Sequence, residues 1–511
     1  MVSLVSFLDE NARRDPDHLA CVVGDDALSY ADLRDASCRF AAALAGLGLQ
    51  PGDRVSLYLP NSAAYVACYL GVMRAGMIAN PVNGVLTPHE VGYMLADSGA
   101  AALVSTKALA DGLAGVLAQT SVRHVISAPA TEESGWHALG ELLASPFGPM
   151  PYPDDQQIAC LPYSSGTTGR PKGIMHSHHS LGMQALLSAN HLQMRPEDVL
   201  VQALPLVHLY PGNIIMGGLF TVGATMVVQP VFDPPAFAAL LAGQRATACA
   251  GVPTTYAMLC QLDEAFVKKL DLSSLRIAYS AGAPLPNRVR TEFGRMFGCR
   301  VLDCYGITEA AGNLCATLRF GDPPELSCGV PYPLTEVKIV DAGDAELPDG
   351  EVGELIARGP QIMSGYWNRP DTTAETLRGG WLHTGDLARR DASGFFYIVD
   401  RAKDVILSGG YNVYPAEVED VLQSYPDVAM CACFAVPDDI KGEKPWAAVV
   451  PRGGSELTTL EAALDKHCRE YLAAYKVPRR FLIVDELPRS SVGKILRREL
   501  RARYATSSGP R

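Results

Sequence analysis

One stretch of eleven residues, 163–173, limits what this chain can fold into more than any other part of the sequence. It follows an apolar run at 158–162 that predicts a short strand, and it consists of Tyr163, Ser164, Ser165, Gly166, Thr167, Thr168, Gly169, Arg170, Pro171, Lys172 and Gly173. Glycine lets backbone N–H groups approach a ligand closely, and serine and threonine hydroxyls add donors without bulk. Lys172 adds a positive charge. We therefore interpret this stretch as a polyphosphate-binding loop, and refer to it as the phosphate loop.

The composition is that of a globular protein with several domains. At 511 residues the chain is too long for one hydrophobic core, and its 48% hydrophobic and 19% charged residues are ordinary for such proteins. The net charge of −12, with acids and bases well mixed, argues against nucleic acid as a partner. The N-terminus lacks the features of a signal peptide, no apolar run approaches the length of a membrane span, and the 13 cysteines are scattered. We expect a cytoplasmic protein with reduced thiols and no integral membrane segment.

Helical and strand patterns alternate in two long parts of the chain, residues 1–110 and 158–319, which predicts two α/β layers. Residues 127–155 contain five prolines and predict an irregular surface connection between them. After residue 329, short strands between Gly, Pro and Asp turns predict a small β-barrel or sandwich. The predicted class is α/β: a large N-terminal domain of two α/β subdomains plus a small β-barrel, residues 1–400, followed by a small α+β domain, residues 401–511.

Two further motifs place a carboxylate beside a turn. Residues 305–309 (Tyr-Gly-Ile-Thr-Glu) offer an aromatic face, a close-approach glycine, a hydroxyl and a carboxylate that has the chemistry to hold the Mg²⁺ of a nucleoside triphosphate. Residues 383–386 (His-Thr-Gly-Asp) end in a carboxylate that suits a pair of ribose hydroxyls. Taken alone, each motif has a simpler interpretation, a solvated glutamate at a strand end in one case and an ordinary β-turn in the other.

Three other places concentrate reactive side chains. His208 lies in an apolar stretch, where a single histidine is usually structural, and Lys494 follows a glycine turn, where most lysines are solvated. The cluster of His176, His178 and His179 suggests a metal site, but no cysteine or acidic residue lies near it with ligand spacing.

Together and in this order, the motifs resemble those of the adenylate-forming superfamily of acyl-CoA synthetases, adenylation domains and luciferases. The resemblance runs from about residue 7 to residue 500 and rests on the phosphate loop, residues 305–309, 383–386 and 400–404, and Gly493-Lys494. Residues 407–419 are similar to the fatty-acyl and medium-chain CoA ligase branch. The resemblance implies a ligase that uses ATP and Mg²⁺. A carboxylate attacks the α-phosphate to give an acyl-adenylate and pyrophosphate, and the thiol of coenzyme A (CoA) then displaces AMP.

The resemblance also implies a role for each matching residue. The residues around the ATP phosphates would be Ser164, Ser165, Gly166, Thr167, Thr168, Gly169 and Lys172, and those around the adenine and α-phosphate would be Gly282, Asp303, Cys304, Tyr305 and Thr308. Asp386 and Arg401 would hold the ribose, and Glu309 with Thr168 would lie at Mg²⁺. Lys494 would reach both the carboxylate and the α-phosphate, and it forms the predicted catalytic set with Glu309 and His208.

In this superfamily the small domain rotates between the two half-reactions, so the resemblance implies that the C-terminal domain is mobile. Lys403 would be the hinge residue, which absorbs a large change in φ and ψ. Gly409 and Gly410 would line the tunnel for the pantetheine arm of CoA.

The resemblance places the acyl pocket at His208, Tyr210, Ile214, Gly312 and Asn313. An apolar mouth with Tyr210 and Asn313 as polar contacts suits a medium- or long-chain acyl or an aryl-propenoic acid. Cys304 stands where hydroxycinnamate:CoA ligases commonly have glycine, and it should narrow the pocket. Leu407 stands where the same branch has lysine. Both differences from the hydroxycinnamate:CoA ligases weaken the assignment of a hydroxycinnamate as the substrate.

Other functions remain open to different degrees. An adenylate-forming enzyme that passes its acyl group to a carrier protein, an amine or another nucleophile would carry the same motifs, and the activated acid need not be a carboxylic acid. A binding protein without activity is disfavoured because the charged residues Lys172, Glu309, Asp386, Arg401 and Lys494 are all present. A plain ATPase or kinase is disfavoured because the phosphate loop lacks the Walker spacing and no kinase loop occurs.

Overall fold

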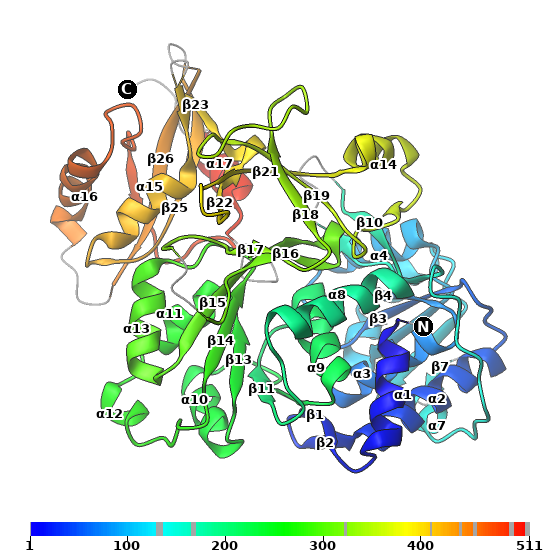
Figure 1. Ribbon diagram of the computed structural model, residues 1–511. Coiled ribbons are helices and arrows are strands. Elements are labelled where there is room, and N and C mark those ends of the chain that lie inside the picture. The colour runs from blue at the N-terminus through cyan, green and yellow to red at the C-terminus, as the bar shows by residue number, and fades with distance from the viewer. Residues whose placement is uncertain are drawn as a thin grey trace.

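The computed structural model describes residues 2–128, 136–164, 170–320, 324–408, 411–438, 442–452, 457–489 and 495–505. These residues form four sheets, and Figure 1 shows helices around the two larger sheets with the two smaller sheets above them. The arrangement confirms the predicted α/β class.

The first large sheet carries the phosphate loop. Its strands are β3 (Arg54–Tyr58), β4 (Ile78–Pro81), β5 (Ala102–Thr106), β6 (His124–Ala128), β7 (Trp136–Ala138), β8 (Ile158–Cys160), β9 (Tyr163–Ser164), β10 (Lys172–Ser177) and β20 (Gly365–Tyr366). Their order is β20-β10-β8-β4-β3-β5-β6-β7, with β9 paired to β10. The pairs from β8 through β7 are parallel, whereas β10 is antiparallel to each of its three neighbours, β8, β9 and β20.

The second large sheet combines the N-terminal hairpin with strands from the middle of the chain. Its strands are β1 (Leu19–Val23), β2 (Asp26–Ser29), β11 (Val199–Gln202), β12 (Thr225–Val228), β13 (Ala248–Gly251), β14 (Ile277–Ala281), β15 (Arg300–Ile307), β16 (Gly312–Ala316) and β17 (Val330–Pro331). Their order is β17-β16-β15-β14-β13-β11-β12-β1-β2. Every residue of β12, β13 and β14 is buried, as expected for parallel strands covered on both faces.

The two smaller sheets follow in the C-terminal part. An antiparallel sheet has the order β18 (Glu336–Val340), β19 (Gly353–Arg358), β21 (Leu382–Arg390) and β22 (Phe396–Arg401). It lies where the sequence predicts a small β-barrel or sandwich, and its strands form an open path in the described residues. We refer to this sheet as the β-rich unit. The last sheet contains β23 (Ile406–Ser408), β24 (Tyr411–Val413), β25 (Val428–Asp438), β26 (Gly442–Pro451) and β27 (Phe481–Ile483).

Capping residues set the ends of the early helices. The Ser29 hydroxyl accepts a hydrogen bond from the Asp32 N–H at the start of α2 (Tyr30–Gly46), and the Ser62 hydroxyl does the same for Tyr65 in α3 (Ala63–Arg74). The other helices of more than one turn are α1 (Leu4–Arg14), α4 (Pro88–Ser98), α8 (His178–His191), α9 (Met216–Val222), α10 (Pro234–Gly243), α11 (Pro253–Leu259), α13 (Asn287–Phe297), α14 (Pro370–Thr376), α15 (Pro415–Ser424), α16 (Leu457–Tyr471) and α17 (Arg497–Ala505). Short helices are α5 (Lys107–Asp111), α6 (Ala114–Leu117), α7 (Leu139–Leu143), α12 (Glu264–Val267), the π-helix η1 (Tyr210–Ile215) and the 3₁₀ turns η2 (Thr308–Ala310), η3 (Arg378–Gly380) and η4 (Ala402–Asp404).

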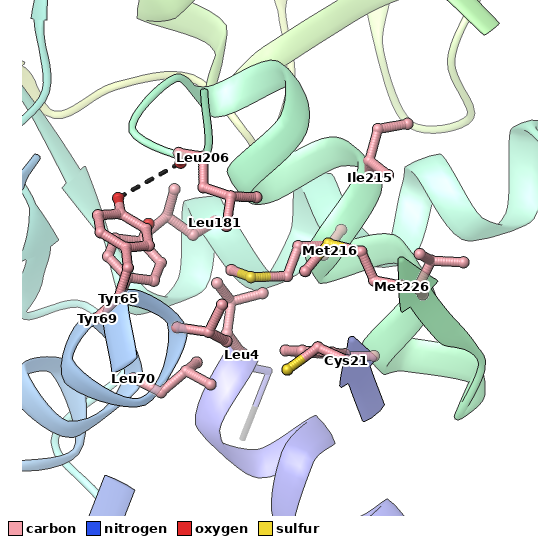
Figure 2. Close-up of a cluster of buried hydrophobic side chains, with 14 of the residues drawn as sticks. Leu4, Cys21, Tyr65, Tyr69, Leu70, Leu181, Leu206, Ile215, Met216 and Met226 are labelled. Atoms are coloured by element: carbon pink, nitrogen blue, oxygen red, sulfur yellow. Dashed lines mark hydrogen bonds between the residues drawn. The ribbon is translucent and has the colours of Figure 1, made fainter. Parts of the chain in front are cut away.

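A buried hydrophobic cluster joins the two large sheets. Figure 2 shows side chains that converge from α1, β1, α3, α8, α9 and β12, among them Leu4, Cys21, Tyr65, Leu70, Leu181, Met216 and Met226. The Tyr65 hydroxyl satisfies its polar end by donating to the Leu206 carbonyl, 3.4 Å away. Because residues of both sheets fill this cluster, the two α/β layers share one core.

The structure differs from the sequence prediction in two places. Residues 127–155, predicted as irregular, contain β7 and α7, because Leu139 and its neighbours pack on the first sheet and on α2. The N-terminal hairpin β1-β2 belongs to the second sheet, although β3, β4 and β5 belong to the first. Within the described ranges, every helix falls short of the length and apolar character that crossing a lipid bilayer requires.

Replacing Leu181 with alanine should destabilise the protein through the shared core. Leu181 lies on α8 and is 1% exposed, so its loss leaves a cavity between the two sheets and lowers stability by roughly 2–5 kcal/mol. Leu186 lies on the same helix and is 42% exposed. The thermal denaturation midpoint should fall clearly in L181A and little in L186A, and equal shifts would contradict the shared core.

Candidate active site

The two arms of the phosphate loop form an antiparallel hairpin. β9 pairs with β10 so that Tyr163 lies opposite Gly173 and Ser164 lies opposite Lys172. The loop residues between the arms that the sequence assigns to the phosphates, Ser165, Gly166, Thr167, Thr168 and Gly169, lie outside the described residues. The hairpin therefore sets Ser164 and Lys172, the two described phosphate-binding candidates, beside each other.

Asp97, at the end of α4, anchors the first arm of this hairpin. The Tyr163 hydroxyl donates to the Asp97 carboxylate at 2.8 Å, and Arg369 forms an ion pair with the same carboxylate at 3.2 Å. Burial raises the pKa of Tyr163, and the neighbouring Asp97 raises it further. On the second arm, the Tyr93 hydroxyl donates to the Pro171 carbonyl at 3.0 Å. Sequence reasoning missed Asp97, because its partners lie 66 and 272 residues away.

Glu309 lies in η2, directly after β15, where three contacts fix its position. His176 Nε2 donates to the Thr308 carbonyl at 2.7 Å, and the Met363 N–H donates to the Glu309 carbonyl at 2.8 Å. Burial lowers the pKa of His176 to about 4, so the ring is neutral and its proton lies on Nε2. The Tyr366 hydroxyl donates to Glu309 Oε1 at 2.8 Å. Tyr366 is a second residue that the sequence did not point to.

The histidine cluster therefore has a structural role at His176. Among the described residues, no group of three or more His, Cys, Asp or Glu side chains is arranged to hold a metal ion.

Asp386 brings together three of the predicted nucleotide-binding residues. It lies on β21 and is 4% exposed, and its two oxygens have different partners. The Tyr305 hydroxyl donates to one oxygen at 2.7 Å, and Arg401 Nε lies 3.2 Å from the other. Lys403 follows in η4, and burial, aided by Arg401, lowers its pKa. Gly282 follows the last residue of β14 and has φ of +90°, a conformation that glycine adopts without strain.

Asp303 and Cys304 point to opposite faces of β15, as neighbours in a strand must. The Asp303 carboxylate faces Arg290 of α13, whose guanidinium lies 3.4 Å away. Burial raises the pKa of Asp303 to about 7, although Arg290 acts in the opposite direction. The Cys304 thiol is buried on the other face with the side chain of Asn313 as its hydrogen-bond partner.

The predicted acyl-pocket residues gather on the Cys304 face. η1 packs against β16, and a Cβ on Gly312 would lie 2.3 Å from the Ile214 side chain. Asn313 donates to the Tyr332 hydroxyl at 3.0 Å, and the Tyr210 hydroxyl donates to the Tyr279 carbonyl at 2.9 Å. His208 precedes η1, its carbonyl accepts from the Gly212 N–H at 2.8 Å, and its Nε2 lies 3.1 Å from the Asn83 amide.

Three predicted site residues of the C-terminal part, Gly409, Gly410 and Lys494, lie outside the described residues. The described part of the site thus contains a phosphate-loop hairpin, the Glu309–Tyr366 pair, the Tyr305–Asp386–Arg401 group and the cluster around Cys304.

Comparison with known proteins identifies the class of this protein. Residues 8–367 match the model of the AMP-binding enzymes, and residues 417–494 match that of the AMP-binding enzyme C-terminal domain. The chain belongs to the AMP-binding enzyme family, which confirms the predicted membership of the adenylate-forming superfamily, of acyl-CoA synthetase type.

Its relatives match over nearly their whole length. A feruloyl-CoA synthase from an Amycolatopsis species is 37% identical over 511 residues, which cover 98% of this chain and 99% of that protein. The long-chain-fatty-acid–CoA ligase of Salmonella typhimurium is 36% identical over 543 residues, covering 98% and 94%. The crystal structure of the anthranilate CoA ligase AuaEII with anthranoyl-AMP superposes with a TM-score of 0.94 at 29% identity, covering 99% and 98%.

The raised pKa of Asp303 predicts a pH-dependent stability. The folded state holds the Asp303 proton more tightly than the unfolded state, and this difference stabilises the folded protein. The stabilising contribution is complete below about pH 4, the ordinary pKa of aspartate. It is lost as the pH rises through about 7. Between pH 6 and pH 8 the wild-type protein should lose on the order of 1 kcal/mol relative to Asp303→Asn. Thermal midpoints of both proteins at the two pH values test this, and a constant difference would contradict it.

Proposed function

We propose that this enzyme is an ATP-dependent acid:CoA ligase that activates a carboxylic acid as an acyl-adenylate and transfers the acyl group to CoA. The observation that carries the proposal is the match to CoA ligases along 98% of the chain. The site geometry supports it, because Lys172 and Glu309 both contact Tyr366, and Asp386 contacts both Tyr305 and Arg401.

The predicted site residues have different roles in the first half-reaction. Attack of a carboxylate on a phosphate brings two anions together, so positive charge placed where negative charge develops lowers the barrier. Lys172, with Ser164 and the loop residues 165–169, binds the β- and γ-phosphates. Asp386 and Arg401 hold the ribose hydroxyls, and the Tyr305 ring and the turn at Gly282 flank the adenine. Lys494 contacts the reacting carboxylate and the α-phosphate.

The donor set around Glu309 suits a magnesium ion. Mg²⁺ prefers oxygen ligands and is usually held by one or two carboxylates together with substrate phosphates. In the described residues, Tyr366 donates to Glu309 Oε1, and the Glu309 carboxylate makes no other hydrogen bond or ion pair there. Glu309, with Thr168 of the phosphate loop, would hold the ion, which would offset the charge of the triphosphate.

The second half-reaction uses the C-terminal domain, residues 401–511 in our division of the chain, with the N-terminal domain at 1–400. Lys403 acts as the hinge. In the thioester-forming arrangement Lys494 leaves the site, and Gly409 and Gly410 line the path of the CoA thiol. The location of Lys403 in η4, directly after the last strand of the β-rich sheet, supports this assignment.

The acid is a medium- or long-chain acyl or an aryl-propenoic acid. Its tail lies against the five residues predicted for the acyl pocket, His208, Tyr210, Ile214, Gly312 and Asn313. The buried Cys304 thiol fills the space that a glycine would leave and favours a narrow tail. The 13 cysteines are all unpaired thiols, which suits the cytoplasmic location that we also propose.

Pyrophosphate release across a panel of acids tests the function. The panel should contain fatty, benzoic and aryl-propenoic acids. Pyrophosphate release should depend on one of these classes, and AMP release should require CoA. If a carrier protein or an amine replaces CoA with equal or higher efficiency, the acceptor in our proposal is wrong. If no acid elicits pyrophosphate, the ligase proposal itself is wrong.

Lys494→Ala should separate the two half-reactions. Removing one well-placed cation lowers the rate of a reaction that develops negative charge by roughly 10²–10³-fold. Pyrophosphate release should fall by that factor, whereas transfer of a supplied acyl-adenylate to CoA should persist. Equal loss of both steps would contradict the role of Lys494 in adenylation.

A further inference from the structure

Tyr366 lies between the two charged groups that the proposed function assigns to ATP. It belongs to β20, where it pairs with Ile174 of β10. Lys172 lies two residues from Ile174 and therefore on the same face of β10. The Lys172 ammonium lies 5.1 Å from the centroid of the Tyr366 ring, and the Tyr366 hydroxyl donates to Glu309 Oε1 at 2.8 Å. One side chain thus contacts the phosphate-loop lysine with its face and the η2 carboxylate with its tip.

We propose that Tyr366 is a positioning residue for Mg²⁺–ATP, whose hydroxyl orients the Glu309 carboxylate and whose ring places the Lys172 ammonium. This inference rests on the proposed function, because it takes Glu309 as the metal carboxylate and Lys172 as a phosphate ligand. Neither of these two residues is held by a charged partner in the described residues, so Tyr366 is the contact that limits where both can point.

The hydroxyl and the ring have separable effects. Hydrogen bonds to a metal-binding carboxylate orient it, and removing such a bond typically lowers metal affinity by roughly 10- to 100-fold. A cation over an aromatic face is held more weakly, and losing the ring should reduce the affinity for the polyphosphate itself by roughly two- to fivefold. Phenylalanine keeps the ring and loses only the hydroxyl, whereas leucine loses both.

The packing of the Tyr366 ring does not by itself account for its contacts with Lys172 and Glu309. Tyr366 is 8% exposed and its ring belongs to the core of the β-rich unit. Its backbone N–H donates to the Thr373 hydroxyl, and its strand pairing involves only backbone atoms. Phenylalanine leaves all of these interactions in place, so any effect of Tyr366→Phe comes from the hydroxyl.

Tyr397 provides a matched control within the same unit. It lies on β22, its hydroxyl donates to the Asp391 carboxylate at 2.8 Å, and the Arg389 guanidinium lies 3.9 Å from its ring centroid. It therefore repeats the combination of carboxylate, hydroxyl, ring and cation with none of the residues that we assign to ATP.

The test measures binding in the full chain without acid or CoA. Mn²⁺ serves as the probe of the metal site, titrated into the complex with α,β-methylene-ATP and followed by electron paramagnetic resonance. Calorimetry measures the affinity for the same analogue in EDTA. Tyr366→Phe should weaken Mn²⁺ binding roughly 10- to 100-fold and leave the EDTA affinity unchanged, with Glu309→Gln setting the upper limit of the loss. Tyr366→Leu should in addition lower the EDTA affinity, and Tyr397→Phe should alter neither.

Unchanged Mn²⁺ affinity in Tyr366→Phe would overturn the proposal, as would equal losses in Tyr366→Phe and Tyr397→Phe. A loss of analogue binding that is the same in Mn²⁺ and in EDTA would also overturn it, because the hydroxyl would then act on the fold. The ligase proposal fails separately, by an absence of acid-dependent pyrophosphate release in the wild-type enzyme. The two results are therefore distinguishable.

Discussion

The backbone ladder β8–β10–β20 is the constraint on which the arrangement of the site depends. β10 carries Lys172 at one end and pairs with β8 of the first sheet on one side. On the other side it pairs with β20, a two-residue strand that comes from the segment between β19 and β21. Since backbone hydrogen bonds fix register, this one strand sets the phosphate-loop hairpin against the β-rich unit that supplies Asp386. A site built from segments that lie far apart in the sequence thereby acquires a defined geometry.

Three tyrosine hydroxyls add side-chain hydrogen bonds to the backbone pairing that arranges the site. Tyr163 donates to Asp97, Tyr305 donates to Asp386 and Tyr366 donates to Glu309, and each pair joins two segments that lie far apart in the sequence. Burial raises the pKa of each of these tyrosines, and the carboxylate partner raises it further, so each hydroxyl remains a donor. A neutral donor can orient a carboxylate without neutralising it, which leaves that carboxylate able to bind a cation or a pair of hydroxyls.

Local pattern predicted the alternation of helices and strands in the two large sheets but not β7 and α7, and short motifs supplied the nucleotide-binding residues that we propose. The alternation of helical and strand patterns predicted for residues 1–110 and 158–319 agrees with the helices and strands of the two large sheets. The pairing of β1 with β12 could not be predicted, since it depends on which sheet has an open edge. Asp97 and Tyr366 were missed for a similar reason. Their partners are set by tertiary packing, and no spacing in the sequence links them.

The alternation of side chains along β15 explains how one strand would serve both substrates of the proposed reaction. Asp303 points toward α13, Cys304 points toward the cluster of Tyr210 and Asn313, and Tyr305 reaches Asp386. Neighbouring residues of a strand face opposite sides, so in the proposed function the selection of the acid and the binding of the nucleotide would depend on adjacent positions with separate surroundings. The side chain at 304 can therefore change the width of the acyl pocket while the backbone that holds Tyr305 stays in place. β15 would supply this separation through the geometry of an ordinary strand.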